Sequence, residues 1–284
     1  MTGPTPRQGG RARGEERRNA AAPLRLAHLY PDHMNLYGDR GNMLCLEARC
    51  RWRGIPLAIT SVDIGDDFQH DAWDMIFIGG GPDREQQRIA RDLAGLKATA
   101  LRQAVEAGVV LLAVCGGYQL LGHYYRPAEG DDLPGVGIFD VHTEHPGPAA
   151  KRCIGNLVAE WLRASSGGGS GRSQQRRDAP HGRTLVGFEN HGGRTYLGPG
   201  CQPLASVLAG FGNNGEDRTE GAVSMNAFGT YLHGSFLPKN PAFADHLISL
   251  ALSRRGDGMA LSSLDDTLEL RAHRAAAALA LRRC

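Results

Sequence analysis

The chain has 284 residues, of which 41% are hydrophobic and 22% are charged, with a net charge of +2. This length and apolar content fit one large domain or two small ones with a substantial core. The sequence lacks the run of roughly 18–20 apolar residues that a membrane-spanning helix needs. The N-terminus also lacks the apolar stretch of a secretory signal. We therefore expect a soluble, cytoplasmic protein without a membrane anchor.

Positive charge is concentrated in two segments of low sequence complexity. Residues 1–23 have a net charge of +3 and residues 163–183 a net charge of +4, which leaves −5 on the rest. The first segment is predicted to be a disordered tail and the second a surface insert. Because a nucleic-acid-binding protein needs a basic face on its folded body, nucleic-acid binding is not expected.

The six cysteines form no CxxC pair. Metal-binding cysteines usually occur in such closely spaced pairs, so we predict no zinc or other metal site. In a chain without a secretory signal, free thiols are expected, several of them buried.

The first half of the chain alternates between predicted strands and predicted helices. The strands are expected at residues 24–29, 55–62, 74–78 and 109–114, and the helices at residues 41–53, 85–107 and 119–124. Near-continuous apolar strands that alternate with helices are typical of a mostly parallel sheet covered by helices. We therefore predict a three-layer α/β sandwich, with the active site at the carboxyl ends of its central strands.

The second half has shorter predicted strands between glycine-rich turns. These strands are expected at residues 136–141, 185–189, 222–226 and 229–232, as antiparallel additions to one sheet, and helices are expected at 241–253 and 264–281. We expect this last helix either to pack on the rest of the domain or to bind a partner protein. The organisation predicted is one domain over residues 24–253 and a helical extension over 254–284.

The strongest chemical signal is Cys115, which follows the apolar strand 109–114 and precedes Gly116 and Gly117. A sharp turn from strand to helix tolerates only small neighbouring residues and lifts the side chain above the sheet. The N-terminal amides of the following helix favour a thiolate. We therefore predict that Cys115 is a nucleophile rather than a structural cysteine.

A thiol nucleophile needs a base, and two of the eleven histidines are candidates. His233 lies at the end of the predicted strand 229–232 and precedes a glycine, a placement that matches Cys115 because ligands gather beyond the carboxyl ends of strands. His191, which precedes Gly192, is the competitor. We prefer His233.

Gly79-Gly80-Gly81-Pro82-Asp83 follows a buried strand and can offer backbone amides to an oxyanion. An ordinary glycine-rich turn or a phosphate loop are the alternatives, but this loop matches neither GxxxxGK[ST] nor GxGxxG. Thiol chemistry on an acyl group, without nucleotide, nicotinamide or metal, is therefore favoured. Peptidase, transferase and amidase activities remain open.

Three features together resemble the class I glutamine amidotransferases over about residues 24–253: Cys115-Gly116-Gly117-Tyr118-Gln119, the glycine loop and the late histidine. Residues 187–193 and 231–234 are similar to the branch related to cobyric acid synthase. The stretch 29–42, Leu-Tyr-Pro-Asp-His-Met-Asn-Leu-Tyr-Gly-Asp-Arg-Gly-Asn, resembles the glutaminase subunits of lipid II isoglutaminyl synthases. The resemblance implies a flavodoxin-like fold and amidation of the α-carboxylate of D-glutamate in the peptidoglycan stem peptide.

The resemblance also implies residue roles. Cys115 would attack the side-chain amide of L-glutamine to form a γ-glutamyl thioester, and His233 would transfer the protons. The amides of Gly81 and Gly116 would hold the oxyanion. The residues implied to bind glutamine are Gln119, Arg152, Asn190, His191 and Gly192, with Arg152 on the carboxylate of glutamine.

One position departs from the class. Most members carry a glutamate two residues after the catalytic histidine, and this chain has Ser235 there. A serine cannot supply the negative charge that stabilises an imidazolium. We therefore expect a Cys–His dyad in the isolated chain, with an acid donated by a partner subunit.

The resemblance implies a heterodimer. Carboxylate amidation needs activation, and the chain has no ATP-binding motif and needs no cofactor of its own. The implied partner is a Mur ligase-like subunit that holds ATP and Mg²⁺ and meets lipid II at the inner face of the membrane. Alternatives are another carboxylate acceptor of corrinoid type, a thiol peptidase, and a catalytically inactive scaffold.

Overall fold

The computed structural model describes residues 22–147, 149–162, 182–258 and 260–282. The predicted tail (residues 1–23) and surface insert (residues 163–183) therefore lie almost entirely outside the described residues.

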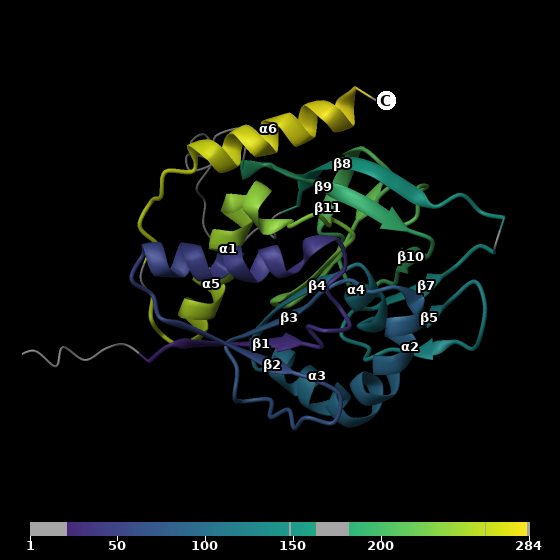
Figure 1. Cartoon of the computed structure of the whole chain (residues 1–284), viewed down its shortest axis with the longest axis horizontal. Helices are drawn as coiled ribbons and strands as arrows, with labels where there is room; N and C mark the ends of the chain where they lie inside the picture. Colours follow the sequence, from purple (N-terminus) through teal and green to yellow (C-terminus); the bar gives the residue numbers. More distant parts are fainter. Residues whose placement is uncertain (1–21, 148, 163–181, 259, 283–284) are drawn as a thin grey trace, which may run out of the picture.

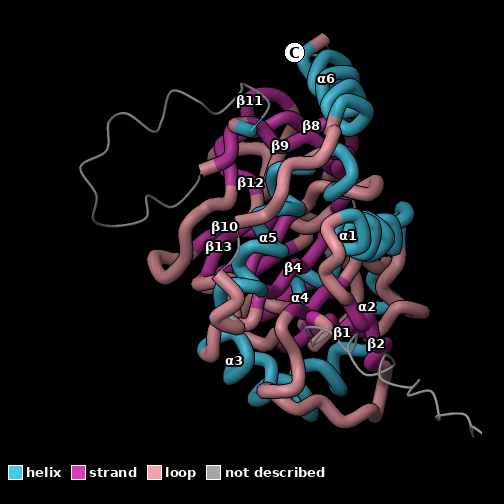
Figure 2. The backbone as a smooth tube through the Cα atoms, turned by 90° about the vertical axis from the view of Figure 1, so that its left-hand side faces the viewer, coloured by secondary structure: helices cyan, strands magenta, loops and turns pink. Residues whose placement is uncertain are grey.

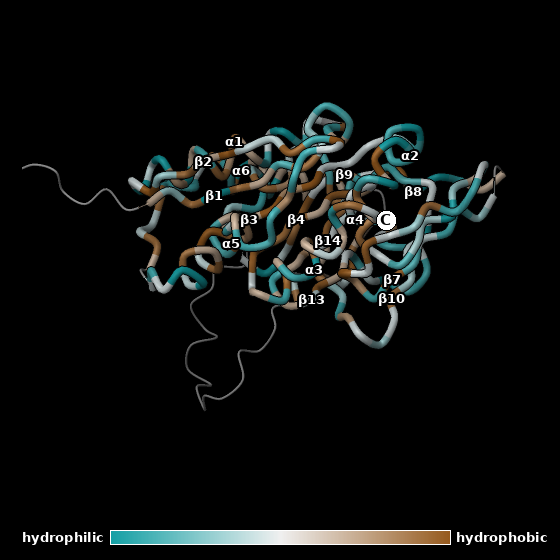
Figure 3. Tube along the Cα trace, turned by 90° about the horizontal axis from the view of Figure 1, so that it is seen from below, coloured by the Kyte–Doolittle hydropathy of each residue, from teal (hydrophilic) through white to brown (hydrophobic). Residues whose placement is uncertain are grey.

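A six-stranded sheet forms the centre of the molecule, in the order β13-β14-β4-β3-β1-β2. Its strands are β1 (Leu24–Leu29), β2 (Leu57–Val62), β3 (Met75–Ile78), β4 (Val110–Val114), β13 (Ala222–Ser224) and β14 (Ala227–Thr230). All neighbouring strands of this sheet pair in parallel except β13, which is antiparallel to β14. β3 and β4 are buried along their whole length, and Figure 3 shows them as largely apolar.

Helices cover both faces of this sheet (Figure 1). One face carries α1 (Arg40–Trp52) and α5 (Pro241–Arg254), and the other carries α2 (Asp83–Arg91) and α3 (Ala98–Glu106). Shorter elements are the helix α4 (Gly116–Leu120), the π-helix η2 (Asp92–Lys97) and the 3₁₀ helices η1 (Leu36–Gly38) and η4 (Leu237–Lys239). The predicted three-layer α/β sandwich with a mostly parallel central sheet is thus confirmed.

The remaining strands form two further four-stranded sheets. One contains β5 (Tyr124–Arg126), β6 (Leu133–Pro134), β7 (Val141–Glu144) and β10 (Arg194–Leu197). The other contains β8 (Cys153–Trp161), β9 (Thr184–His191), β11 (Ala205–Ala209) and β12 (Thr219–Glu220). The expectation that the later strands would be antiparallel additions to one sheet therefore holds for β13 but not for β9, which lies in a separate sheet. It also fails for β14, which is buried along its whole length and pairs in parallel with β4 at the centre of the fold.

Two predicted elements are displaced where the chain leaves α4. The predicted helix over 119–124 ends at Leu120, and of the predicted strand 136–141 only Val141 lies in a strand. The reason is local hydrogen bonding, because the N–H groups of Ile138 and Phe139 donate to the carbonyl of Leu121 at 2.9 and 3.1 Å. The N–H groups of this segment therefore bond to the carbonyl group that follows α4 rather than to a neighbouring strand.

The C-terminal helix α6 (Thr267–Leu281) packs on the body of the molecule, across β8, β9 and β11 (Figure 2). Ala280 joins Val158, Val186 and Ala209 in a small apolar cluster. Of the two placements considered for this helix, packing on the body is the one observed. Among the described residues, no helix has both the length and the apolar character needed to cross a bilayer.

Arg49 ties the segment before α6 to the sandwich. The side chain of Arg49 is only 1% exposed, and its guanidinium lies 2.7 Å from a carboxylate oxygen of Asp245 on α5 and 2.7 Å from one of Asp266. Arg53 adds a bond from Nε to the carbonyl of Ser262, at 2.8 Å. Ion pairs from α1 therefore hold both α5 and the residue that precedes α6.

Candidate active site

Cys115 occupies the sharp turn between β4 and α4. Its φ of +50° lies in the left-handed region, and its N–H donates to the carbonyl of Thr230 at 2.8 Å. A Cβ atom on Gly117 would lie 2.7 Å from the carbonyl oxygen of Gly79, so only glycine allows this approach. The backbone is therefore strained where the thiol is presented, as expected for a nucleophile at such a turn.

The glycine loop after β3 lies against both Cys115 and His233. A Cβ atom added to Gly80 would be 2.7 Å from Cε1 of His233 and 3.2 Å from Cβ of Cys115. A Cβ atom on Gly116 would lie 2.9 Å from the carbonyl oxygen of Gly81. The fold thus brings the predicted nucleophile, the predicted base and the glycine loop together in one place.

His233 is buried and is held three residues beyond the end of β14. Its N–H donates to the carbonyl of Phe188 on β9 at 2.7 Å. Burial by itself lowers the pKa of the imidazole, but the hydrogen bonds and charge interactions with Cys115 and Asp39 outweigh burial and raise this pKa to about 10. The geometry therefore favours the imidazolium form of His233.

The carboxylate that faces this imidazole belongs to the chain itself. Oδ1 of the fully buried Asp39 lies 3.5 Å from Nδ1 of His233, while Oδ2 accepts the N–H of Gly80 at 2.7 Å. The isolated chain thus has a carboxylate beside His233, which the expected dyad did not include, because the class motif places the acid at position 235; an acid from a partner subunit stays a prediction. The available signal was the stretch 29–42, which contains Asp39 and carries the resemblance to the lipid II glutaminase subunits.

A buried network positions the loop that carries Asp39. Tyr30, at a φ of +51°, donates its hydroxyl to Asp92 at 2.6 Å, and Asp92 also forms a buried ion pair with Lys97. The carbonyl of Tyr30 then accepts the N–H of Met34 at 2.8 Å. A Cβ atom on Gly79 would be 2.2 Å from the carbonyl oxygen of Met34, so the loop lies directly on the glycine turn.

The backbone amides of Gly81 and Gly116, predicted to hold an oxyanion, lie close to Cys115. The amide of Gly116 opens α4, where first-turn N–H groups have no partner within the helix. No hydrogen bond from the Gly81 amide is found among the described residues. The neighbouring Gly80 amide already donates to Asp39, so Gly81 and Gly116 are the pair available at this site.

Gln119 lies one turn along α4 from Cys115, and its side chain is held at both ends. Its Oε1 accepts a hydrogen bond from Nε2 of Gln86 at 3.1 Å, and its Nε2 donates to the hydroxyl of Tyr231 at 3.0 Å. Gln86 also donates to the carbonyl of Gly81 at 3.1 Å. Sequence reasoning missed Gln86 and Tyr231, because their roles depend on contacts between distant segments.

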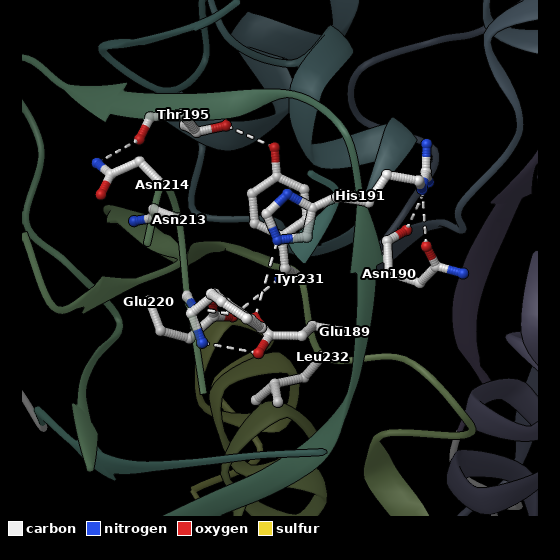
Figure 4. A network of polar contacts seen from close by, with 12 residues as sticks. Glu189, Asn190, His191, Thr195, Asn213, Asn214, Glu220, Tyr231 and Leu232 are labelled. Atoms are coloured by element: carbon white, nitrogen blue, oxygen red, sulfur yellow. Dashed lines mark hydrogen bonds and ion pairs between the residues drawn. The ribbon is translucent and has the colours of Figure 1, made fainter. Parts of the chain in front are cut away.

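His191 is enclosed in the fold. Its ring stacks on Tyr231, with ring centroids 3.6 Å apart (Figure 4). Its Nδ1 lies 2.8 Å from the carbonyl oxygen of Gly193. Burial lowers its pKa, so the ring is neutral near pH 7. His191 therefore stacks within a buried network, whereas the imidazole beside Cys115 is that of His233.

The turn after β9 carries the other implied glutamine-binding residues. Arg152 donates from Nε to Oδ1 of Asn190 at 3.0 Å and from Nη2 to the carbonyl of Asn190 at 3.2 Å. A Cβ atom on Gly192 would lie 3.2 Å from Nη1 of Arg152, and one on Gly193 would lie 2.9 Å from Nε2 of Gln119. The structure thus places Arg152, Asn190 and Gly192 together, next to a residue that touches Gln119.

Sequence comparison assigns the chain to a family. Residues 25–241 match the CobB/CobQ-like glutamine amidotransferase domain, and the chain belongs to this family. It is also 38% identical, over 88% of its length and 93% of the relative's, to the lipid II isoglutaminyl synthase (glutamine-hydrolyzing) subunit GatD of Staphylococcus aureus. The GatD subunit of Streptococcus pneumoniae is 37% identical over 86% of this chain and 87% of its own.

Two further comparisons concern the extent and the fold of the domain. A cobyric acid synthase from Pelotomaculum thermopropionicum is 35% identical, but the match covers 56% of this chain and 29% of that protein. The solved structure of PurLQS from Thermotoga maritima superposes with a TM-score of 0.56 at 15% identity, covering 82% of this chain and 99% of that one. The predicted flavodoxin-like fold of class I glutamine amidotransferases is thereby confirmed.

Proposed function

We propose that this chain is the glutamine-hydrolysing subunit of a lipid II isoglutaminyl synthase. The observation that carries the glutaminase chemistry is the strained Cys115 turn, with Gly80 packed against both Cys115 and His233. The choice of acceptor rests on the two GatD relatives, which this chain matches over nearly their whole length. The corrinoid alternative has weaker support, because the match covers 29% of a cobyric acid synthase.

The first half of the reaction is acyl transfer to sulfur. The Cys115 thiolate attacks the side-chain carbonyl carbon of L-glutamine, and the amides of Gly81 and Gly116 stabilise the resulting oxyanion. The imidazolium of His233 then protonates the leaving nitrogen, and the C–N bond breaks. Ammonia and a γ-glutamyl thioester are the products of this step.

The second half is hydrolysis of the thioester. His233, now neutral, accepts a proton from water as the water attacks the acyl carbon, and glutamate leaves as sulfur regains its negative charge. Asp39 stabilises the imidazolium in both halves, in the role that an aspartate has beside the histidine of a catalytic triad.

Glutamine is bound by the residues around Gln119 and the turn after β9. Arg152, held by Asn190, presents a guanidinium suited to the α-carboxylate of glutamine. Gln119 and Gly192 line the approach to Cys115. His191 contributes through its backbone and through its stack on Tyr231, because its ring is enclosed.

The ammonia is used on a partner subunit. Amidation of a carboxylate requires its activation, and we assign ATP and Mg²⁺ to a Mur ligase-like partner in a heterodimer, with no cofactor on this chain. The complex works in the cytoplasm, where the partner meets lipid II at the inner face of the membrane. Because ammonia is largely protonated near neutral pH, transfer through a sheltered path is expected.

The test is ammonia release from glutamine by wild type and Cys115→Ala, with and without the ligase partner, ATP and lipid II. Release that requires Cys115 and rises with partner, ATP and lipid II is the expected result. Release that requires Cys115 but ignores lipid II would contradict the acceptor. Absence of release under all conditions would favour the inactive scaffold.

A further inference from the structure

Glu220 is a buried carboxylate that holds the chain segment leading to His233. Its Oε1 accepts hydrogen bonds from the hydroxyl of Thr230 at 2.6 Å and from the backbone N–H of Tyr231 at 2.8 Å. Figure 4 shows Glu220 beside Tyr231 and Asn213, on the far side of Tyr231 from Thr195. Glu220 thus fixes two consecutive residues at the end of β14.

The same segment also contacts the nucleophile. The carbonyl of Thr230 accepts the N–H of Cys115 at 2.8 Å, and its hydroxyl accepts the N–H of Leu232 at 3.0 Å. Thr230 therefore bonds to the backbone of Cys115, to Glu220 and to the residue that precedes His233. Any shift of this segment would move His233 relative to Cys115.

The surroundings of Glu220 provide hydrogen-bond donors but no cation. Among the described residues, no ion pair includes Glu220, and its Oε2 has no hydrogen-bond partner. The titratable groups nearby are Glu189 on β9, Tyr118 on α4 and Tyr231, whose backbone N–H Glu220 accepts. Glu189 accepts the N–H groups of Phe211 and Gly212, at 2.7 and 2.9 Å.

This environment makes the charge of Glu220 depend on pH near neutrality. Burial raises its pKa, against the bonds from Thr230 and Tyr231, to about 7. An ionised carboxylate accepts stronger hydrogen bonds than a protonated one. Deprotonation should therefore tighten the hold on Thr230 and Tyr231, and protonation should loosen it.

We infer that Glu220 is a positioning residue for glutamine hydrolysis, which acts through Thr230 and Tyr231 to fix His233 against Cys115. This inference rests on the proposed glutaminase function and adds a residue that does not touch the substrate. The hydroxyl of Tyr231 extends the effect to Gln119, to which it is hydrogen-bonded.

A matched pair at Thr230 tests the hydrogen bonds. Thr230→Val keeps the size of the side chain but removes the hydroxyl, whereas Thr230→Ser keeps the hydroxyl. In the complex with the ligase partner, we expect Thr230→Val to lower kcat for glutamine hydrolysis at least about tenfold, because small displacements of catalytic groups are costly. KM should stay within about twofold, and Thr230→Ser should retain most of kcat.

A pH profile tests the carboxylate. In wild type, we expect kcat to rise through pH 7 as Glu220 ionises, which gives the pH profile an ascending limb. In Glu220→Gln this ascending limb should be missing. Glu189→Gln removes the neighbouring buried carboxylate instead, so it should keep the limb and move it to lower pH. Circular dichroism and thermal melting identify variants that fail to fold, and Glu220→Asp, which restores the charge, should restore the limb.

The outcomes separate the two proposals. Absence of Cys115-dependent hydrolysis in the wild-type complex would contradict the proposed function. Active wild type, with a Thr230→Val variant of equal kcat or a Glu220→Gln variant that keeps the limb, would overturn only the inference about Glu220.

Discussion

The hydroxyl of Ser235 donates a hydrogen bond to the carbonyl of Gly38, at 2.9 Å, in the residue that precedes Asp39. Ser235 adopts a φ of +53°, and a Cβ atom on Gly41 would lie 2.2 Å from its hydroxyl oxygen. At the position where most class I members carry an acidic residue, this chain therefore has a serine. That serine is hydrogen-bonded to the loop that contains Asp39.

Asp39→Asn should reduce kcat for glutamine hydrolysis by about 10²-fold or more, since the amide cannot stabilise the imidazolium. The asparagine oxygen can still accept the N–H of Gly80, so the loop should stay in place. The variant should also have a lower pKa at His233, because Asp39 is one of the groups that raise it. Steady-state kinetics and NMR titration of the imidazole measure the two effects.

Ser235→Ala is the control for Asp39. It removes one exposed hydrogen bond to the loop and leaves the carboxylate, so a loss of less than about tenfold in kcat is expected. Equal losses in both variants would mean that Asp39 acts only by holding the loop.

Gly80→Ala should abolish hydrolysis while leaving most of the fold intact. The added methyl group would lie 2.7 Å from the ring of His233, which cannot stay beside Cys115. Gly155→Ala is the matched control, because a Cβ atom there would have no neighbour within 4 Å. Ammonia release measures the effect, and near-normal activity of Gly80→Ala would contradict the site geometry.

Cys115 should be the first described cysteine to react with iodoacetamide near pH 7.5. Burial raises the pKa of Cys45 and Cys50 to about 12 and that of Cys153 and Cys201 to about 11, which keeps these thiols protonated. Peptide mass spectrometry on a Cys284→Ala background gives the labelling order. Prior incubation with a glutamine-like electrophile should protect Cys115 alone.

Arg49→Ala should lower the free energy of unfolding by about 3 kcal/mol, because it leaves the partly buried Asp266 without its cation and Asp245 with that of Arg53 alone. Arg88→Ala removes a mostly exposed ion pair with Glu85 and should cost no more than about 0.5 kcal/mol. Urea denaturation provides both values. If both variants lost the same free energy of unfolding, the ion pairs of Arg49 would contribute no more to stability than an exposed ion pair.

Glu220 should make the folded state less stable as pH rises from about 4.5 to 7. Its pKa is raised from 4.5 to about 7 by burial, so the folded chain binds this proton more tightly than the unfolded chain. Between pH 5 and pH 8, Glu220→Gln should gain up to about 3 kcal/mol of stability relative to wild type. A difference between the two proteins that does not change with pH would contradict this prediction.

Local sequence patterns were sufficient to predict the sandwich and the sharp turn at Cys115. The apolar run of β4 and the two glycines after Cys115 dictate the turn within a few residues, and the strands of the first half follow the same logic. Pairing of distant strands has no such local signal. The sequence of β14 indicates a hairpin with the adjacent β13 no more clearly than it indicates the parallel pairing with β4, and the structure contains both.

The parts of the site that escaped prediction all depend on contacts across long sequence separations. Asp39 reaches His233 only because Tyr30 turns the chain back over the glycine loop. Glu220 and Tyr231 carry no motif in the sequence, and their link to the segment of His233 consists of hydrogen bonds around Thr230. A motif indicates the reacting atoms, whereas the groups that orient them follow from the packing.

The anchoring of the chain before α6 has a practical consequence for limited proteolysis. A single cut between Arg255 and Ser262 would leave α6 attached through the bonds of Arg49 to Asp266 and of His273 to Thr184, at 2.7 and 2.9 Å. The nicked protein should therefore migrate as one particle on gel filtration and separate into two fragments only in denaturant.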